Sequence, residues 1–437
     1  MNNKNKTAHS LKTFLIMWST QSLSHLGSSM TSFALTLWLY QKTGSALQTA
    51  LLAICSYAPY VLMSIFAGAL SDHWDKKKVM LLSDTFAASS TIVVLVLLKT
   101  DLLGPIHMYV LNAFNGLMNT IQQPASDVAM TLITPKDEYQ KTSGLRSLSQ
   151  SLVTVLHPML ATALFAVAGM DIVIIVDLST FVIAFFALLF FVKLPHIKDE
   201  EAKKEVTEKK ESIFVASKAG LSYLKDNPMI LHLILFLAGV NFVASIFDAT
   251  LPAYVLPREN GGEKVLGIVT SCAGFATLFG SLLVTVLPKP KNRIRVIIGT
   301  MLFSLTIENF LLAFTRTPAL WYFGQFLGWF VVPIMSANLD VILRTTIPVD
   351  MQGRVYSCRN TLQFFTIPIG FFLGGLLVDR VWEPMMAGIQ ESHWLVFLFG
   401  TGKGSGAAVM MFVVGLAGAI VCIVFGQLLK KYRFVES

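Results

Sequence analysis

Four long stretches of the amino-acid sequence contain no Lys, Arg, Asp or Glu residue: 13–40, 43–71, 265–288 and 406–429. A helix needs about 20 residues to cross the hydrocarbon core of a bilayer, so each stretch is long enough to span one. The whole chain of 437 residues is 54% hydrophobic and 14% charged, whereas soluble domains are about 25% charged. The sequence therefore predicts an all-α, multi-pass membrane protein.

The apolar segments predict twelve transmembrane helices. They lie near residues 12–40, 46–71, 78–98, 105–133, 143–168, 171–193, 229–256, 264–288, 295–315, 318–346, 351–378 and 405–429. A hydrophilic segment with alternating Lys and Glu follows the sixth helix and cannot bury enough apolar surface to fold alone. We therefore expect a six-helix bundle in 1–193, a cytoplasmic linker in 194–228 whose residues 213–225 suit an interfacial helix, and a second six-helix bundle in 229–437.

Charge distribution predicts the orientation. If both termini are cytoplasmic, the inner segments contain 27 of the 34 Lys and Arg residues, as expected because cytoplasmic loops are enriched in basic residues. This placement also accounts for the net charge of +8 without a nucleic-acid partner. We expect a multi-pass protein of the plasma membrane. The four cysteines all fall within apolar segments, and their spacing predicts neither a disulfide framework nor a metal site.

An internal repeat supports the division into two halves. A shift of 213 positions superposes six identical residues at the ends of corresponding helices, among them Asp127 on Asp340 and Arg146 on Arg359. Parallel repeats of this kind build transporters whose substrate site lies where the halves meet.

The loop between the second and third helices contains a charged motif, Gly68-Ala-Leu-Ser-Asp72-His-Trp-Asp-Lys-Lys77-Lys78. It resembles the signature of the major facilitator superfamily, with a histidine in place of one basic residue and Asp75 in place of a glycine. The resemblance implies the major facilitator fold of two parallel six-helix repeats and a conformational latch. In this interpretation the latch includes a partner acid at the inner end of the fourth helix and, in the second half, the repeat-related Asp340 with Arg344 four residues later. The expected latch residues are Gly68, Asp72, Lys77, Lys78, Asp127, Asp340 and Arg344. The alternative is that the lysines only anchor a cytoplasmic loop.

Three further stretches, 144–150, 348–357 and 399–406, resemble the drug:proton antiporter branch that includes macrolide efflux transporters. The resemblance implies a monomeric secondary transporter, not an enzyme, that uses the proton motive force and no cofactor to export bulky amphipathic compounds. Where many such antiporters have an arginine, nine residues before a proline equivalent to Pro124, this chain has Asn115. A lipid or amphiphile translocator on the same fold and a non-transporting membrane receptor or scaffold are the alternatives.

Polar side chains recur on one face of the helices that are expected to line the cavity. In the fourth helix they are three or four residues apart, the spacing of one helical face. Unpaired amides facing lipid are costly, so these faces are predicted to line a hydrated cavity; hydrogen bonding between helices is the alternative. The predicted substrate cavity includes Gln21, Asn112, Asn115, Asn119, Gln122, Asn241 and Trp329.

Ionisable residues within the membrane are candidates for proton coupling, because a carboxylate in a low dielectric tends to take up a proton. Asp248 in the seventh helix shares a face with Asn241 and is the first candidate, followed by Glu308 and then His25. A structural role is the alternative for each of them.

Overall fold

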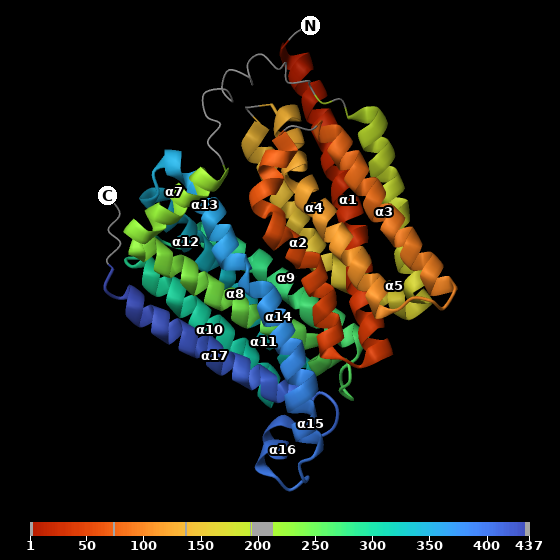
Figure 1. Ribbon diagram of the computed structural model, residues 1–437, viewed down its shortest axis with the longest axis vertical. Coiled ribbons are helices and arrows are strands. Elements are labelled where there is room, and N and C mark those ends of the chain that lie inside the picture. The colour runs from red at the N-terminus through yellow and green to blue at the C-terminus, as the bar shows by residue number, and fades with distance from the viewer. Residues whose placement is uncertain (1–2, 73–74, 136–137, 193, 195–212, 433–437) are drawn as a thin grey trace. The chain divides into compact units, whose positions relative to one another are not determined.

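The computed structural model describes residues 3–72, 75–135, 138–192, 194 and 213–432, and within these ranges the regular secondary structure is entirely helical (Figure 1). The first half of the chain forms long helices in the order α1 (Asn3–Thr43), α2 (Ala46–Asp72), α3 (Lys76–Lys99), α4 (Pro105–Ile133) and α5 (Tyr139–Phe186), and ends in the π-helical segment η2 (Ala187–Phe191).

Helix α5 contains the fifth and sixth predicted spans. Its backbone leaves the helical region at Ala168 (φ −140°, ψ 15°) and Gly169 (φ 70°, ψ −162°). A positive φ is sterically accessible mainly to glycine, so Gly169 allows the sharp change of direction between the two spans. The break lies where the sequence predicts it, between residues 168 and 171.

The second half begins with α7 (Ile213–Asp226), which coincides with the predicted interfacial helix. The tenth and eleventh spans are each interrupted, and short π-helical and α-helical segments extend the eleventh. The elements are α8 (Pro228–Val255), α9 (Glu263–Val286), α10 (Arg293–Phe314), α11 (Pro318–Phe330), α12 (Val332–Thr346), α13 (Val349–Phe364), α14 (Thr366–Leu377), η3 (Val378–Trp382), α15 (Glu383–Ala387), α16 (Trp394–Phe399) and α17 (Ser405–Leu429).

Proline explains the interruptions. The first lies at Val331, two residues before Pro333, and the second at Phe365, three residues before Pro368. Proline has no backbone N–H and its ring clashes with the preceding turn, which breaks or kinks a helix.

Nine helical stretches of the described chain are long and apolar enough to cross a membrane. One of them, residues 144–191, is 48 residues long and is divided at Gly169 into two spans. The remaining two membrane-length helices, α1 and α4, carry more polar residues. The described structure therefore agrees with the predicted all-α fold of twelve transmembrane helices.

Contacts divide the chain into two compact units. Unit 1 comprises Met1–Ser32, Cys55–Val153 and Ala168–Ala219, and unit 2 comprises Phe33–Ile54, Thr154–Val167 and Gly220–Ser437. Unit 2 thus includes parts of α1, α2 and α5 from the first half of the sequence. The division into bundles 1–193 and 229–437 at a linker stays a prediction.

Each unit has its own apolar core. In unit 1, Phe14 and Met17 of α1 pack with Met80 of α3 and Ala125 of α4. In unit 2, α8 packs against α14 and α17, and α10 packs against α11 and α17. The largest buried side chains of that core are Trp321, Tyr254 and Phe236, and Leu37 and Ala46 from the first half of the sequence belong to the same cluster.

Large apolar side chains are also exposed on the helices. Examples on α17 are Ile420, Ile423 and Val424. A soluble monomer rarely exposes extensive apolar surface, whereas a bilayer solvates it, so this exposure suits lipid contact.

Candidate functional site

Asp248 is the conspicuous polar residue of α8. It is exposed, although the three residues on either side of it along the helix are all buried. Its carboxyl forms no hydrogen bond or ion pair with the residues that the structure describes. An unpaired carboxylate is costly in hydrocarbon, so this side chain belongs at a hydrated surface.

Glu308 of α10 lies in unit 2 as well and is buried, with 5% of its surface exposed. The amide nitrogen of Gln325 donates to Glu308 Oε1 over 2.8 Å, and the amide oxygen of Gln325 accepts from Trp329 Nε1 over 3.2 Å. A Cβ on Gly328 would lie 2.3 Å from Glu308 Oε2. The carboxyl therefore occupies the space that glycine leaves on α11, and a chain of hydrogen bonds connects it to the half-buried Trp329.

Asp248 and Glu308 both belong to unit 2, and Gln325 joins Glu308 to Trp329. The structure thus places the first two proton-coupling candidates and one cavity candidate, Trp329, in the same unit.

A different carboxyl organises the polar residues of unit 1. Asp84 of α3 is half-buried and accepts hydrogen bonds from Gln21 Nε2 of α1 (3.1 Å) and from Gln122 Nε2 of α4 (2.5 Å). The structure therefore brings together two predicted cavity residues on a third residue that was not among the predicted site residues. The sequence signal was present, because Asp84 is the only acid within the third predicted span, 78–98.

The remaining cavity candidates of α4 have different surroundings. Asn112 is half-buried and Asn119 is exposed. The side-chain oxygen of Asn115 is buried and has no hydrogen-bond partner among the described residues. On α1, His25 is exposed. Each of these residues stays a candidate for the cavity or, for His25, for proton coupling.

Asn241 of α8 contacts the interruption in the eleventh span. Its Nδ2 donates to the backbone carbonyl of Gln363 over 3.2 Å, and Thr366 Oγ1 donates to the carbonyl of Ala238 over 3.0 Å. These two bonds join α8 to the residues on either side of the break at Phe365. Asn241 thus donates to a backbone carbonyl next to the break in the eleventh span.

At the start of the latch motif, the surroundings of Gly68 and the side chain of Asp72 lie outside what the structure describes. Lys77 Nζ donates to the carbonyls of Leu189 (2.9 Å) and Val192 (2.7 Å) at the end of the sixth span. Asp75, which replaces the glycine of the family motif, accepts from the backbone N–H of Lys78 over 2.9 Å and caps α3. The motif therefore joins the start of α3 to the end of the sixth span within unit 1.

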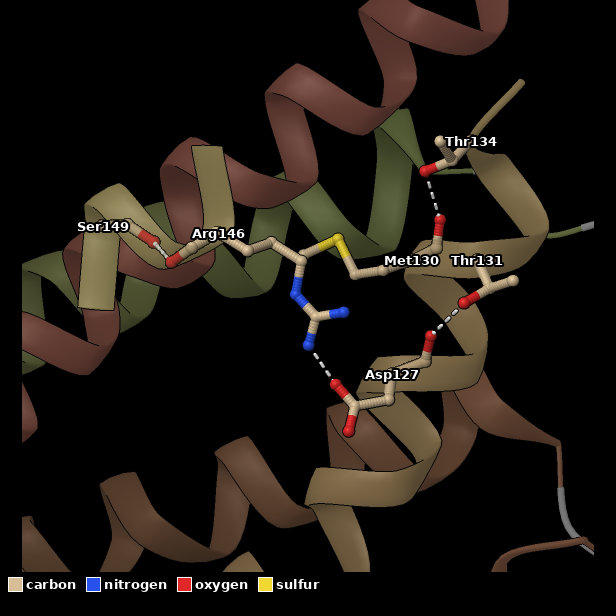
Figure 2. A network of polar contacts seen from close by, with 6 residues as sticks. All are labelled: Asp127, Met130, Thr131, Thr134, Arg146 and Ser149. Carbon is tan, nitrogen blue, oxygen red and sulfur yellow. Dashed lines mark hydrogen bonds and ion pairs between the residues drawn. The ribbon is translucent and has the colours of Figure 1, made fainter. Parts of the chain in front are cut away.

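Figure 2 shows the partner of Asp127: Arg146 extends from α5 toward the Asp127 carboxyl on α4, and the two form an ion pair. In the same region of α4, side-chain hydroxyls donate to backbone carbonyls one turn earlier; Thr131 Oγ1, for example, donates to the Asp127 carbonyl over 2.8 Å. In the repeat-related position of unit 2, Asp340 and Arg344 form an ion pair of 3.8 Å within α12. The two acids thus occupy equivalent positions of the repeat, but their basic partners do not, since Arg146 corresponds to Arg359 and not to Arg344.

Comparison with known proteins identifies the family. The sequence profile of the Major Facilitator Superfamily matches residues 17–307. Macrolide efflux protein A of Streptococcus pyogenes is 24% identical over 392 residues, which cover 88% of this chain and 91% of that protein. The multidrug efflux pump Tap of Mycolicibacterium fortuitum is 22% identical over 360 residues, 81% of this chain and 86% of its own length.

Solved structures show the same fold. A bacterial homologue of the iron transporter ferroportin, in an inward-facing state, superposes with a TM-score of 0.68 at 16% identity, over 95% of this chain and 98% of that one. A bacterial homologue of the human lysosomal transporter Spinster gives a TM-score of 0.67 at 13% identity, over 98% and 99%. Members of the matched family are transporters that normally need no cofactor, which agrees with the prediction of a transporter and not an enzyme. The chain belongs to the Major Facilitator Superfamily and is a membrane transporter.

Proposed function

We propose that this transporter exports bulky amphipathic, macrolide-like compounds by alternating access, in exchange for protons. The observation that carries the proposal is Asp248, an exposed carboxyl on an otherwise buried stretch of a membrane helix. The names of the relatives, macrolide efflux and multidrug efflux, support the substrate class.

Proton exchange requires a group whose charge state changes with the side of the membrane that it faces. Asp248 takes up a proton from the outside and releases it to the inside. Because a neutral acid tolerates a drier environment than a carboxylate, protonation favours the conformation in which the site is occluded. A ligand shifts such an equilibrium by its different affinity for the two states.

Glu308 is proposed to assist Asp248. Glu308 is buried in the same unit as Asp248, and a buried acid that changes its protonation state is a second candidate for carrying the proton. Gln325 and Trp329 keep Glu308 in place and connect it to the cavity. His25 is a third candidate for the proton pathway. The polar residues Gln21, Asn112, Asn115, Asn119, Gln122 and Asn241, together with Trp329, are the proposed lining of the substrate cavity.

The latch is proposed to hold the inner ends of the helices in one state of the cycle. The lysines at 77 and 78 act with Gly68 and Asp72 in the first repeat, and Asp127 contributes through its pair with Arg146. Asp340 and Arg344 serve the second repeat. We further propose that the protein works as a monomer in the plasma membrane with both termini cytoplasmic.

The test is transport by the purified protein in liposomes with an imposed pH gradient and radiolabelled erythromycin. We expect drug movement coupled to the gradient, and in Asp248→Asn a loss of that coupled movement by at least about tenfold, since an amide cannot carry the proton. Movement that persists after the gradient is collapsed would contradict proton exchange.

Asp171→Asn is the matched control. Asp171 is also a carboxylic acid on a membrane helix, but its side chain is 39% exposed and forms an ion pair with Lys99 at the end of α3. An exposed ion pair contributes little to stability, so this variant is expected to transport like the parent. Equal losses in both variants would remove Asp248 from the proposed role.

A further inference from the structure

Asp379 of η3 binds the beginning of a helix from the other half of the sequence. Its Oδ1 accepts from the backbone N–H of Ala46 (2.9 Å), and its Oδ2 accepts from the backbone N–H of Leu47 (2.9 Å) and from Ser45 Oγ (2.5 Å). The donors lie at the first turn of α2, and the two partners are more than 330 positions apart in the sequence. All of these residues belong to unit 2.

These contacts form a helix cap supplied from elsewhere in the chain. The first N–H groups of a helix have no partner within it, and the positive end of the helix dipole favours an anion there. Ser45 Oγ also accepts from the N–H of Gln48 over 3.1 Å. The local hydroxyl therefore satisfies one N–H group, and the distant carboxylate satisfies two.

Close packing accompanies the cap. A Cβ on Gly375, one turn before Asp379, would lie 2.6 Å from the Cα of Leu47. Beneath it, Ala50 of α2, Ala249 of α8 and Phe371 of α14 form a small buried cluster. η3 is a π-helical segment, an irregularity that is often found at functional sites.

A second carboxylate provides an internal comparison. Glu383 lies four residues after Asp379, and its Oε1 accepts from the N–H groups of Gly404 and Ala407, both over 3.0 Å, at the start of α17. Arg258 Nη2 donates to the carbonyl of Gly404 over 3.1 Å; burial lowers the pKa of this arginine, and the Glu383 charge opposes that shift. Glu383 therefore caps a helix of its own half, whereas Asp379 caps a helix of the first half.

Helix α2 belongs to both compact units. Its residues up to Ile54 are part of unit 2, and those from Cys55 onward are part of unit 1. Within unit 2, the end of α1 is likewise bonded to a helix of the second half, since Gln41 Nε2 donates to Glu263 Oε1 at the start of α9. The cap therefore holds the part of α2 that belongs to unit 2, in the same helix that continues into unit 1 after Ile54.

We propose that Asp379 is a gate residue: its cap on α2 forms when the transporter is closed at the α1–α2 turn and breaks when that end opens. This inference rests on the alternating access of the proposed function, but not on the identity of the drug or the ion. Water replaces the lost partners on opening, so the net cost of breaking the contact is small enough for a reversible gate.

The experiment measures opening directly, without transport. Ala50, with 1% of its surface exposed, is replaced by cysteine and its labelling by a membrane-impermeant maleimide is timed on purified protein in nanodiscs; the parent protein gives the background of the four native cysteines. Asp379→Asn is expected to raise the labelling rate roughly tenfold, the effect of losing a helix cap. Asparagine has one acceptor oxygen, so at least one N–H of α2 loses its partner.

Two further variants make the result specific. Glu383→Gln retains the oxygen that accepts both of its hydrogen bonds, so its labelling rate is expected to stay within about twofold of the parent. The labelling rate of Ser45→Ala is expected to lie between those of the parent and of Asp379→Asn. Ala249→Cys is a second reporter on the facing helix. An unchanged rate in Asp379→Asn, or an equal rise in Asp379→Asn and Glu383→Gln, would overturn the proposal; failure of drug transport alone would not affect it.

Discussion

At the scale of single residues, the candidate site of unit 2 depends on a glycine. Gly328 faces the Glu308 side chain so closely that a Cβ would lie 2.3 Å from Oε2 and 2.8 Å from the Cβ of Glu308. Such distances are impossible without movement of the carboxyl or of α11. The position of Glu308, and its bond to Gln325, therefore depends on the absence of a side chain at residue 328.

Gly328→Ala is expected to lower the free energy of unfolding by about 1–3 kcal/mol, the usual cost of overpacking a core, and to reduce proton-coupled transport because Glu308 is displaced from Gln325. Thermal unfolding in detergent and the liposome assay measure the two effects. Gly299→Ala is the control, since a Cβ at Gly299 of α10 meets no atom within 4 Å. An equal melting temperature for the two variants would show that Glu308 has room to move.

Residue patterns in the sequence identified part of the site. The polar face of α4 and the intramembrane acids were visible from spacing alone, and the structure joins Gln21 to Gln122 through Asp84 and Glu308 to Trp329 through Gln325. The joining residues, Asp84 and Gln325, were not predicted. A hydrogen bond between helices depends on which faces meet, and this information is not contained in the periodicity of one helix.

At the scale of elements, the break in α5 shows how one residue separates two spans. Gly169 has φ 70° and ψ −162°, a combination that is essentially restricted to glycine. No atom lies within 4 Å of a Cβ placed there, so a substitution would meet backbone strain and no steric clash.

Gly169→Ala is therefore expected to destabilise the protein by about 1–3 kcal/mol, measured as a lower melting temperature. Gly144→Ala lies in the same helix with equally open surroundings and without a positive φ, and is expected to leave the melting temperature unchanged or slightly raised, because alanine has the higher helix propensity. Equal melting temperatures for the two variants would show that the break does not depend on the positive φ of Gly169.

At the scale of the whole molecule, the two compact units defined by contacts do not coincide with the two halves defined by the sequence repeat. Parts of α1, α2 and α5 belong to unit 2, and the remainder of each belongs to unit 1. A transporter that alternates between two states needs contacts that can be exchanged, and helices shared between two units are natural places for them.

The orientation of the molecule is tested with an epitope tag added after residue 437. Both termini are proposed to be cytoplasmic, so protease added to right-side-out membrane vesicles is expected to leave the tag intact, and inside-out vesicles are expected to lose it completely, since basic residues are retained inside. Loss of the tag in right-side-out vesicles would reverse the proposed orientation.

The sequence by itself determined that this chain is a membrane protein of twelve helices, because the length and polarity of a span are local properties imposed by the thickness of the bilayer. It also determined the place of the break at Gly169 and the polar faces, which follow from glycine conformation and helical period. Only the tertiary structure decided that Asp379 caps α2, that Asp84 joins two glutamines and that Glu308 lies against Gly328. These contacts join residues far apart in the chain, and their geometry exists only after the helices have packed.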